Sequence, residues 1–115
     1  MRFGAADAAS ALAALTIGAV FYCQSALAQA QFSADDIERG HAQFERTCAQ
    51  CHGRNMVNSG TTSYDLRRFP LDDAQRFFTS VTNGKGNMPS FREALTEDQI
   101  RLLWAYVGSR GGKEQ

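Results

Sequence analysis

The five residues Cys48-Ala49-Gln50-Cys51-His52 constrain this chain more than any other feature of its sequence. Two thiols separated by two residues, with an imidazole directly after the second, are typical of the attachment site of a c-type haem. The spacing lets both sulfurs reach one porphyrin edge, where each forms a thioether with a vinyl group. The motif therefore predicts a covalent haem bound through Cys48 and Cys51, with His52 as one axial ligand of the iron.

The same motif has other interpretations: half of a zinc site, a redox-active cysteine pair, a short disulfide, or chance. A structural zinc ion needs four ligands, whereas the only other histidine is His41 and no second C-x-x-C occurs. No βαβ pattern surrounds the motif, as a thioredoxin-like pair requires. A disulfide across so short a gap closes a strained loop. We favour haem attachment and expect His41 to be a surface residue rather than a ligand.

Residues 1–28 are typical of a cleaved secretory signal peptide. Arg2 precedes an apolar segment at 8–23, and Ala26-Leu27-Ala28 matches an A-x-A cleavage site. Cleavage would leave residues 29–115 as the haem-binding domain. An uncleaved membrane anchor is the alternative, because residues 8–28 are long enough to span a bilayer. Export agrees with the cysteine motif, since c-type haem is attached outside the bacterial inner membrane, and we expect a periplasmic protein.

Length and charge restrict the partners. Residues 29–115 carry equal numbers of basic and acidic side chains. This balance argues against a nucleic-acid partner, which usually needs a basic face. A chain of 115 residues allows one domain. A domain this short has a marginal hydrophobic core, which a covalent haem would enlarge.

Apolar spacing predicts three helices and no strand. The first begins at Ser33, ahead of an acidic turn, and its apolar face includes Gly40, Phe44 and Cys48. A glycine within a helix costs about 1 kcal/mol relative to alanine. Gly40 therefore indicates that another helix backbone approaches closely.

The other two helices lie in the second half of the chain. One has Asp72 as its expected N-cap and a stop signal at Asn83-Gly84. The last begins at Thr96, where Thr96-Glu97-Asp98-Gln99 matches a capping box, and we expect it to end at Gly111-Gly112.

Two loops carry further candidate residues. Residues 53–70 are polar, and within them Met56 is expected to fill space beside the ring. Arg67 and Arg68 are candidates for pairing with a haem propionate, and solvated surface charge is an equal alternative. Met88, followed by Pro89, stands 36 residues after His52 in a loop between helices. A thioether there can reach the other face of the haem, so we predict that Met88 is the second axial ligand.

Together these features resemble a small class I cytochrome c over about residues 33–110. Gly40 and Phe44 stand eight and four residues before the first cysteine, as in that family. Leu103 and Tyr106 match the positions that pack against them, and Met88-Pro89 matches the distal ligand loop. The resemblance implies an all-α class I cytochrome c fold, with three main helices around one covalently attached haem. One departure is the lack of a proline in the loop after His52, whose neighbouring carbonyl orients the imidazole in the family; another carbonyl should replace it.

The resemblance also implies a function: a monohaem periplasmic carrier of single electrons, a monomer, and not an enzyme. Residues 64–70 and 102–107 are similar to small cytochromes that accept electrons from quinoprotein dehydrogenases, which suggests such a donor. A terminal oxidase or another cytochrome would be the acceptor, and no small-molecule substrate is expected. The alternatives are a fixed cytochrome subunit of a dehydrogenase or oxidase complex, and a haem enzyme or gas sensor with an open distal site.

Overall fold

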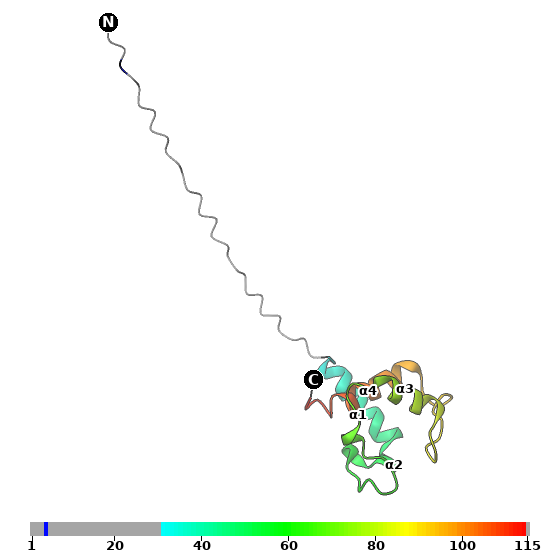
Figure 1. Ribbon diagram of the computed structural model, residues 1–115. Coiled ribbons are helices and arrows are strands. Elements are labelled where there is room, and N and C mark those ends of the chain that lie inside the picture. Colours follow the sequence, from blue (N-terminus) through cyan, green and yellow to red (C-terminus); the bar gives the residue numbers. More distant parts are fainter. Residues whose placement is uncertain (1–3, 5–30, 115) are drawn as a thin grey trace.

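The computed structural model describes residue 4 and residues 31–114, and in this part of the chain the fold is helical (Figure 1). The elements in chain order are α1 (Ala34–Thr47), α2 (Ala49–His52), η1 (Arg54–Met56), η2 (Leu66–Arg68), α3 (Ala74–Asn83) and α4 (Glu97–Gly108), where η marks a 3₁₀ turn. No strand occurs in the described residues, so the predicted all-α class is confirmed. The signal peptide predicted for residues 1–28 lies, apart from Gly4, outside the described residues.

Among the described helices, none combines the length and the apolar character needed to cross a bilayer.

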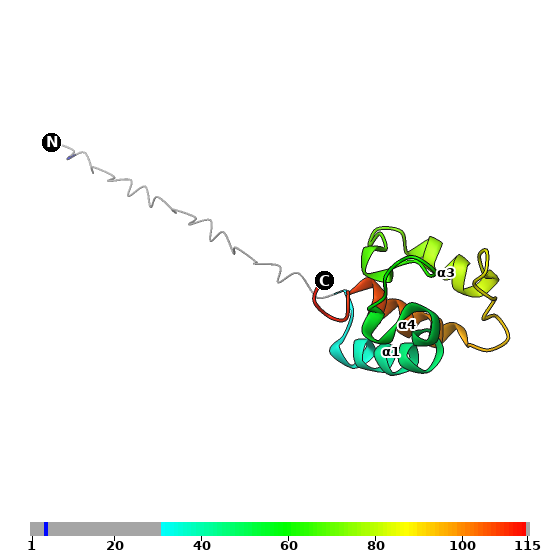
Figure 2. The ribbon, with the colours of Figure 1, turned by 90° about the horizontal axis from the view of Figure 1, so that it is seen from below.

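Helix α1 packs against α4, and this contact explains Gly40 (Figure 2). A Cβ atom added at Gly40 would lie 1.9 Å from the carbonyl oxygen of Leu102, far inside van der Waals contact. The close backbone approach expected from the sequence is therefore confirmed. One turn further along α1, Phe44 is fully buried, and its ring centroid lies 5.2 Å from that of Tyr106.

We expect Gly40→Ala to destabilise the haem-loaded protein by about 1–3 kcal/mol, because the added methyl group forces the two backbones apart. Alanine normally stabilises a helix relative to glycine by about 1 kcal/mol, so the sign of the change is diagnostic. Denaturant unfolding would measure it. The matched control is Ala42→Gly on the exposed face of α1, which should cost only the helix-propensity difference. A Gly40→Ala protein at least as stable as the wild type would contradict this packing.

A second cluster of aromatic side chains joins α3 and the loop before it to α4. The Trp104 ring lies 5.1 Å from Phe77 on α3 and 5.9 Å from Phe69 in the preceding loop, centroid to centroid. All three side chains are buried. Burial of rings of this size dominates the energetics of a small core, so α4 is the element on which both halves of the domain pack.

The N-terminus of α3 differs from the sequence prediction by one residue. The N-cap is Asp73, not Asp72: the Asp73 carboxylate accepts a hydrogen bond from the Arg76 backbone N–H at 3.2 Å. The Asp73 N–H in turn donates to the Pro70 carbonyl at 3.3 Å. The turn after Pro70 is therefore one residue longer than expected, and α3 begins one residue later.

The end of α4 also differs. The helix ends at Gly108 rather than at Gly111-Gly112. The Gly111 N–H donates to the Tyr106 carbonyl at 2.8 Å, the long-range bond of a Schellman motif. The first residue in the left-handed region after the helix is Arg110, with φ of 48°, and Gly111 and Gly112 follow it with φ of 70° and 87°. Because the two glycines come after the residue that ends the helix, they placed the predicted end of α4 too late.

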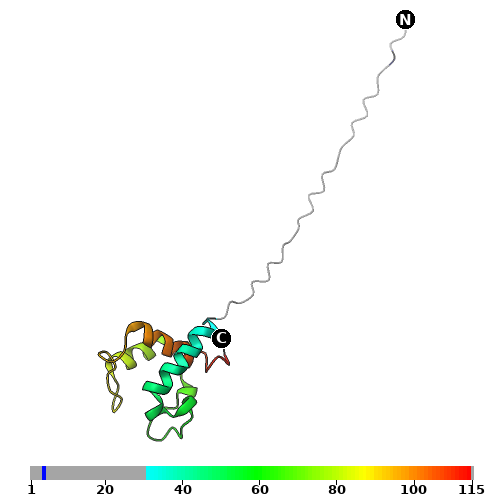
Figure 3. The ribbon, with the colours of Figure 1, turned by 180° about the vertical axis from the view of Figure 1, so that it is seen from behind.

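Two segments project to the same side of α4 (Figures 1 and 3). One contains α2 and the loop that follows it. The other is the segment between α3 and α4, drawn in yellow. The first carries the cysteine–histidine motif and the second carries Met88.

Candidate functional site

Helix α2 is a single turn that brings the motif residues together. Cys48 ends α1 and begins α2, and its carbonyl accepts hydrogen bonds from the N–H groups of Cys51 at 3.1 Å and of His52 at 2.9 Å. Cys48 is half-buried, Cys51 is exposed, and neither forms a disulfide. The turn therefore presents two free thiols and an imidazole within five consecutive residues.

The electrostatics of Cys48 do not suit a redox-active or metal-binding thiol. Burial, and to a smaller extent repulsion from Cys51, together raise the pKa of this thiol to about 12. Redox-active and metal-ligating cysteines instead work as thiolates with lowered pKa values. The part of the chain that the structure describes also holds no cluster of three or more His, Cys, Asp or Glu side chains able to bind a metal ion. The raised pKa of Cys48 argues against the zinc and thioredoxin-like interpretations.

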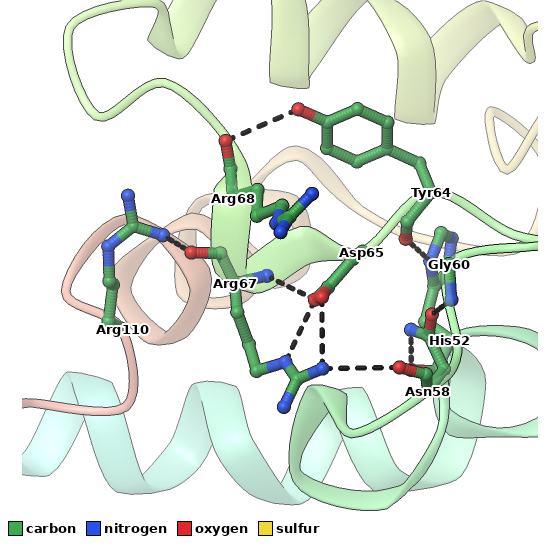
Figure 4. A network of polar contacts seen from close by, with 8 residues as sticks. All are labelled: His52, Asn58, Gly60, Tyr64, Asp65, Arg67, Arg68 and Arg110. Carbon is green, nitrogen blue, oxygen red and sulfur yellow. Dashed lines mark hydrogen bonds and ion pairs between the residues drawn. The ribbon is translucent and has the colours of Figure 1, made fainter.

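The His52 ring is held by a backbone carbonyl. Its Nδ1 lies 3.0 Å from the Tyr64 carbonyl oxygen, as the close view shows (Figure 4). A carbonyl only accepts hydrogen bonds, so Nδ1 carries the proton and Nε2 keeps its lone pair. This is the usual arrangement of a histidine that binds a metal through Nε2. Tyr64 thus provides the carbonyl that the missing proline left unassigned.

A second bond fixes the same residue from its backbone side. The Asn58 side-chain amide donates to the His52 carbonyl at 2.7 Å. Asn58 and Tyr64 belong to one loop, so this loop contacts His52 at two points. Sequence reasoning missed both residues. A carbonyl acceptor leaves no trace in side-chain identity, and one asparagine in a polar loop carries no signal of its own.

Arg67 is engaged within the protein. Its guanidinium donates from Nε to Asp65 Oδ1 and from Nη2 to Asp65 Oδ2, both at 2.9 Å. The hydrogen bonds from Arg67 hold the pKa of the Asp65 carboxyl below its usual range. The adjacent Arg68 is exposed, and its side chain forms no hydrogen bond or ion pair within the described chain, although its charge also helps to lower the pKa of Asp65. Of the two candidates for a propionate, Arg68 is the one whose guanidinium is not already hydrogen-bonded.

Met88 lies in a tight hairpin between α3 and α4. The backbones of Lys85 and Met88 exchange two hydrogen bonds of 3.0 Å each. Met88 is half-buried and packs against the hydrophobic core. The hairpin lies close to the end of α3: a Cβ atom added at Gly84 would lie 2.7 Å from the Met88 carbonyl oxygen.

The remaining candidates have structural surroundings. Met56 is 3% exposed and belongs to the hydrophobic core. His41 is half-buried rather than fully on the surface: its ring stacks on Tyr106 at 4.7 Å, and its Nε2 lies 2.7 Å from Asn55 Oδ1. His41 therefore contacts α4 through Tyr106 and η1 through Asn55.

Comparisons with known proteins identify the family of this chain. A family model described as "Cytochrome C oxidase, cbb3-type, subunit III" matches residues 35–107. The cytochrome c6 of Gloeothece citriformis is 39% identical over 84 residues, which cover 70% of this chain and 76% of that protein. The cytochrome c6 of Rippkaea orientalis is 40% identical over 78 residues, 64% of this chain and 70% of the relative. The chloroplastic cytochrome c6 of Arabidopsis thaliana is 38% identical over 88 residues, 63% of this chain and 50% of the relative.

The resemblance noted in the sequence is thereby confirmed, and with it the covalent haem c that the family carries. The chain belongs to this family of small, monohaem, class I c-type cytochromes, and it is an electron-transfer protein rather than an enzyme.

Proposed function

We propose that Cys48 and Cys51 hold the haem through thioethers and that its iron is bound by His52 and Met88. The observation that carries this proposal is the hydrogen bond between His52 Nδ1 and the Tyr64 carbonyl, which leaves Nε2 available as a ligand. The residues fit the group: two free thiols precede this imidazole on one turn. The Met88 hairpin projects to the same side of α4 (Figure 1).

The chain's own residues then account for electron transfer. Haem c supplies a one-electron couple between ferric and ferrous iron. His52 contributes a neutral nitrogen whose orientation the Tyr64 carbonyl fixes. Met88 contributes a soft, neutral thioether, which favours the reduced state. If His52 and Met88 both bind the iron, no coordination position would remain for a substrate.

We propose that the carrier works in the periplasm, between a dehydrogenase and an acceptor such as a terminal oxidase. Residues 1–28 support export, and the similarity of residues 64–70 and 102–107 to acceptors of quinoprotein dehydrogenases supports the donor. The test is a stopped-flow experiment in which a quinoprotein dehydrogenase reduces the purified cytochrome and a terminal oxidase reoxidises it. Reduction no faster than by an unrelated dehydrogenase would contradict the donor assignment.

The rates should depend only weakly on salt, because the side chains of residues 29–115 carry no net charge and only the haem propionates would add to it. Long-range steering requires a charged field over the docking face. We expect the second-order rate constant to change less than about tenfold between low and physiological ionic strength, a change that strongly steered pairs exceed. A steep fall with added salt would instead reveal docking through a charged patch.

A second candidate is a cytochrome subunit held permanently in an oxidase. The description of the matching family, which names an oxidase subunit, favours it, whereas the relatives named cytochrome c6 favour the carrier. Purification from native membranes and periplasm under mild conditions separates the two. A fixed subunit remains with its complex, and a carrier is recovered alone in the soluble fraction.

Gly84 offers a test of the Met88 loop. We expect Gly84→Ala to weaken the bond between Met88 and iron, because the new Cβ atom collides with the backbone of residues 88–90. The matched control is Gly86→Ala. Gly86 also has a positive φ, of 58°, but a Cβ atom there meets nothing within 4 Å. Loss of the sulfur-to-iron absorption band at lower temperature in Gly84→Ala than in Gly86→Ala would support the proposal, and equal behaviour would contradict it.

A further inference from the structure

We propose that Arg67 is a positioning residue for His52: its guanidinium holds the Tyr64 carbonyl against the imidazole Nδ1 and thereby tunes the reduction potential. This inference rests on the proposed function, in which His52 is an axial ligand. Arg67 has no contact with His52 and acts through the loop between them (Figure 4).

The loop contacts His52 at two anchor points. The Tyr64 carbonyl accepts from the imidazole at 3.0 Å, and the Asn58 side chain donates to the His52 carbonyl at 2.7 Å. Between these two residues the chain has no helix or strand. No backbone hydrogen bond within this segment therefore fixes the distance between Asn58 and Tyr64.

Arg67 connects the two anchors with one rigid group. Nε and Nη2 bind the carboxylate of Asp65, the residue that follows Tyr64. The same Nη2 also donates to the Asn58 carbonyl at 3.1 Å. A planar guanidinium can make these contacts at once, because its donors have a fixed fork geometry. A lysine ammonium is a point charge on a flexible stem and cannot reproduce them.

Arg67 is itself fixed to the main body of the domain. Its carbonyl accepts a hydrogen bond from the guanidinium of Arg110, just beyond the end of α4. Arg110 Nη2 also donates to the Phe69 carbonyl at 3.2 Å. A continuous set of contacts therefore runs from the end of α4 through Arg67 and Asp65 to the carbonyl that binds His52.

The chemical consequence follows from the hydrogen bond at Nδ1. An acceptor at this nitrogen raises the basicity of the imidazole and so stabilises the more positive, ferric iron. If the Tyr64 carbonyl is held less firmly, the imidazole becomes a weaker donor. Ferrous iron is then relatively favoured, and the reduction potential rises.

The chain supplies a matched control in the next residue. Arg68 carries the same charge in the same turn, but its exposed side chain forms no hydrogen bond or ion pair with the described residues. Arg67→Gln and Arg68→Gln therefore remove equal charge at adjacent positions. Arg67→Lys keeps the charge and removes the fork, and Asp65→Asn removes the partner.

The experiment measures two quantities on the haem-loaded proteins: the reduction potential, and the exchange rate of the His52 Nδ1 proton by ¹⁵N NMR in the ferrous state. For Arg67→Gln, Arg67→Lys and Asp65→Asn we expect exchange about fivefold faster than in the wild type, the effect of losing one exposed bidentate pair. The potential should rise in Arg67→Lys and Asp65→Asn, and that of Arg67→Gln should lie above that of Arg68→Gln, which loses the same charge. Arg68→Gln should leave the exchange rate unchanged.

The direction of the change in reduction potential separates a positioning role of Arg67 from an effect of its charge alone. A charge effect alone lowers the potential in Arg67→Gln, raises it in Asp65→Asn and leaves Arg67→Lys like the wild type. Wild-type exchange and potential in Arg67→Lys would therefore overturn the inference. If Arg67→Gln does not fold, Arg67→Lys and Asp65→Asn still decide the question.

Failure of the proposed function gives a different result. In that case the His52 ring of the ferric wild-type protein shows no paramagnetic shift, because it is not bound to iron. A shifted His52 ring, together with unchanged exchange in Arg67→Lys and Asp65→Asn, overturns the positioning role alone.

Discussion

The Cys48→Ala/Cys51→Ala chain is expected to contain no covalent haem. Each thioether needs a sulfur, and Cys48 and Cys51 are the free thiols that the described structure offers. The measurement is the mass of the intact, denatured chain. The wild type should be heavier than its polypeptide by the mass of one haem, and the double variant should match the polypeptide alone. Because so short a domain has a marginal core, we also expect the double variant to lose its cooperative unfolding transition.

The matched control for this result is Gln50→Ala. Gln50 lies between the two cysteines and is exposed, so its replacement leaves both sulfurs in place. It should retain the haem and unfold like the wild type. A double variant that still carried haem through the denaturing step would show attachment elsewhere in the chain and contradict the proposed site.

Met88→Ala is expected to open one axial position of the iron. The sulfur-to-iron band of the ferric protein should disappear, and carbon monoxide should bind the ferrous protein readily. The potential should fall, because the thioether that favours ferrous iron has been removed. The fall should be a sizeable fraction of the roughly 0.8 V range that axial ligands span among haem proteins. Absorption spectroscopy and a redox titration measure these effects.

Met56→Ala is the matched control, because it removes the same side chain from the hydrophobic core. Met56 is 3% exposed, so the replacement should destabilise the protein by about 2–5 kcal/mol through the cavity it leaves. The sulfur-to-iron band should persist. If Met56→Ala lost the band and Met88→Ala kept it, the assignment of the distal ligand would be wrong.

Much of the fold could be predicted because it depends on local signals and one unusual glycine. The Ser33 and Thr96 caps are read from the side chains that form them, and both are found in the structure. Gly40 indicated a close helix contact because its cost in a helix requires a compensating reason. The errors fell at Asp73 and Arg110. There the outcome depends on which of two adjacent aspartates caps the helix, and on an arginine that adopts a conformation more typical of glycine.

The site could be predicted only where side-chain chemistry defines it. The spacing of the two cysteines and His52 carries its own chemical reason, so these residues could be named from the sequence. The Tyr64 carbonyl could not be named, because any residue at that position has one. Its role depends on how residues 53–65 fold back over α2, and that path is set by contacts of Asn58 and Arg67 that no local pattern reveals.

The most direct test of the account is the absorption spectrum of the purified wild-type protein, first oxidised, then reduced, then exposed to carbon monoxide. His52 and Met88 as axial ligands predict a sulfur-to-iron charge-transfer band in the ferric protein. They also predict no change in the ferrous spectrum when carbon monoxide is added. A ferric spectrum without that band, together with ready binding of carbon monoxide, would show an open axial position. That result would contradict the electron carrier proposed here.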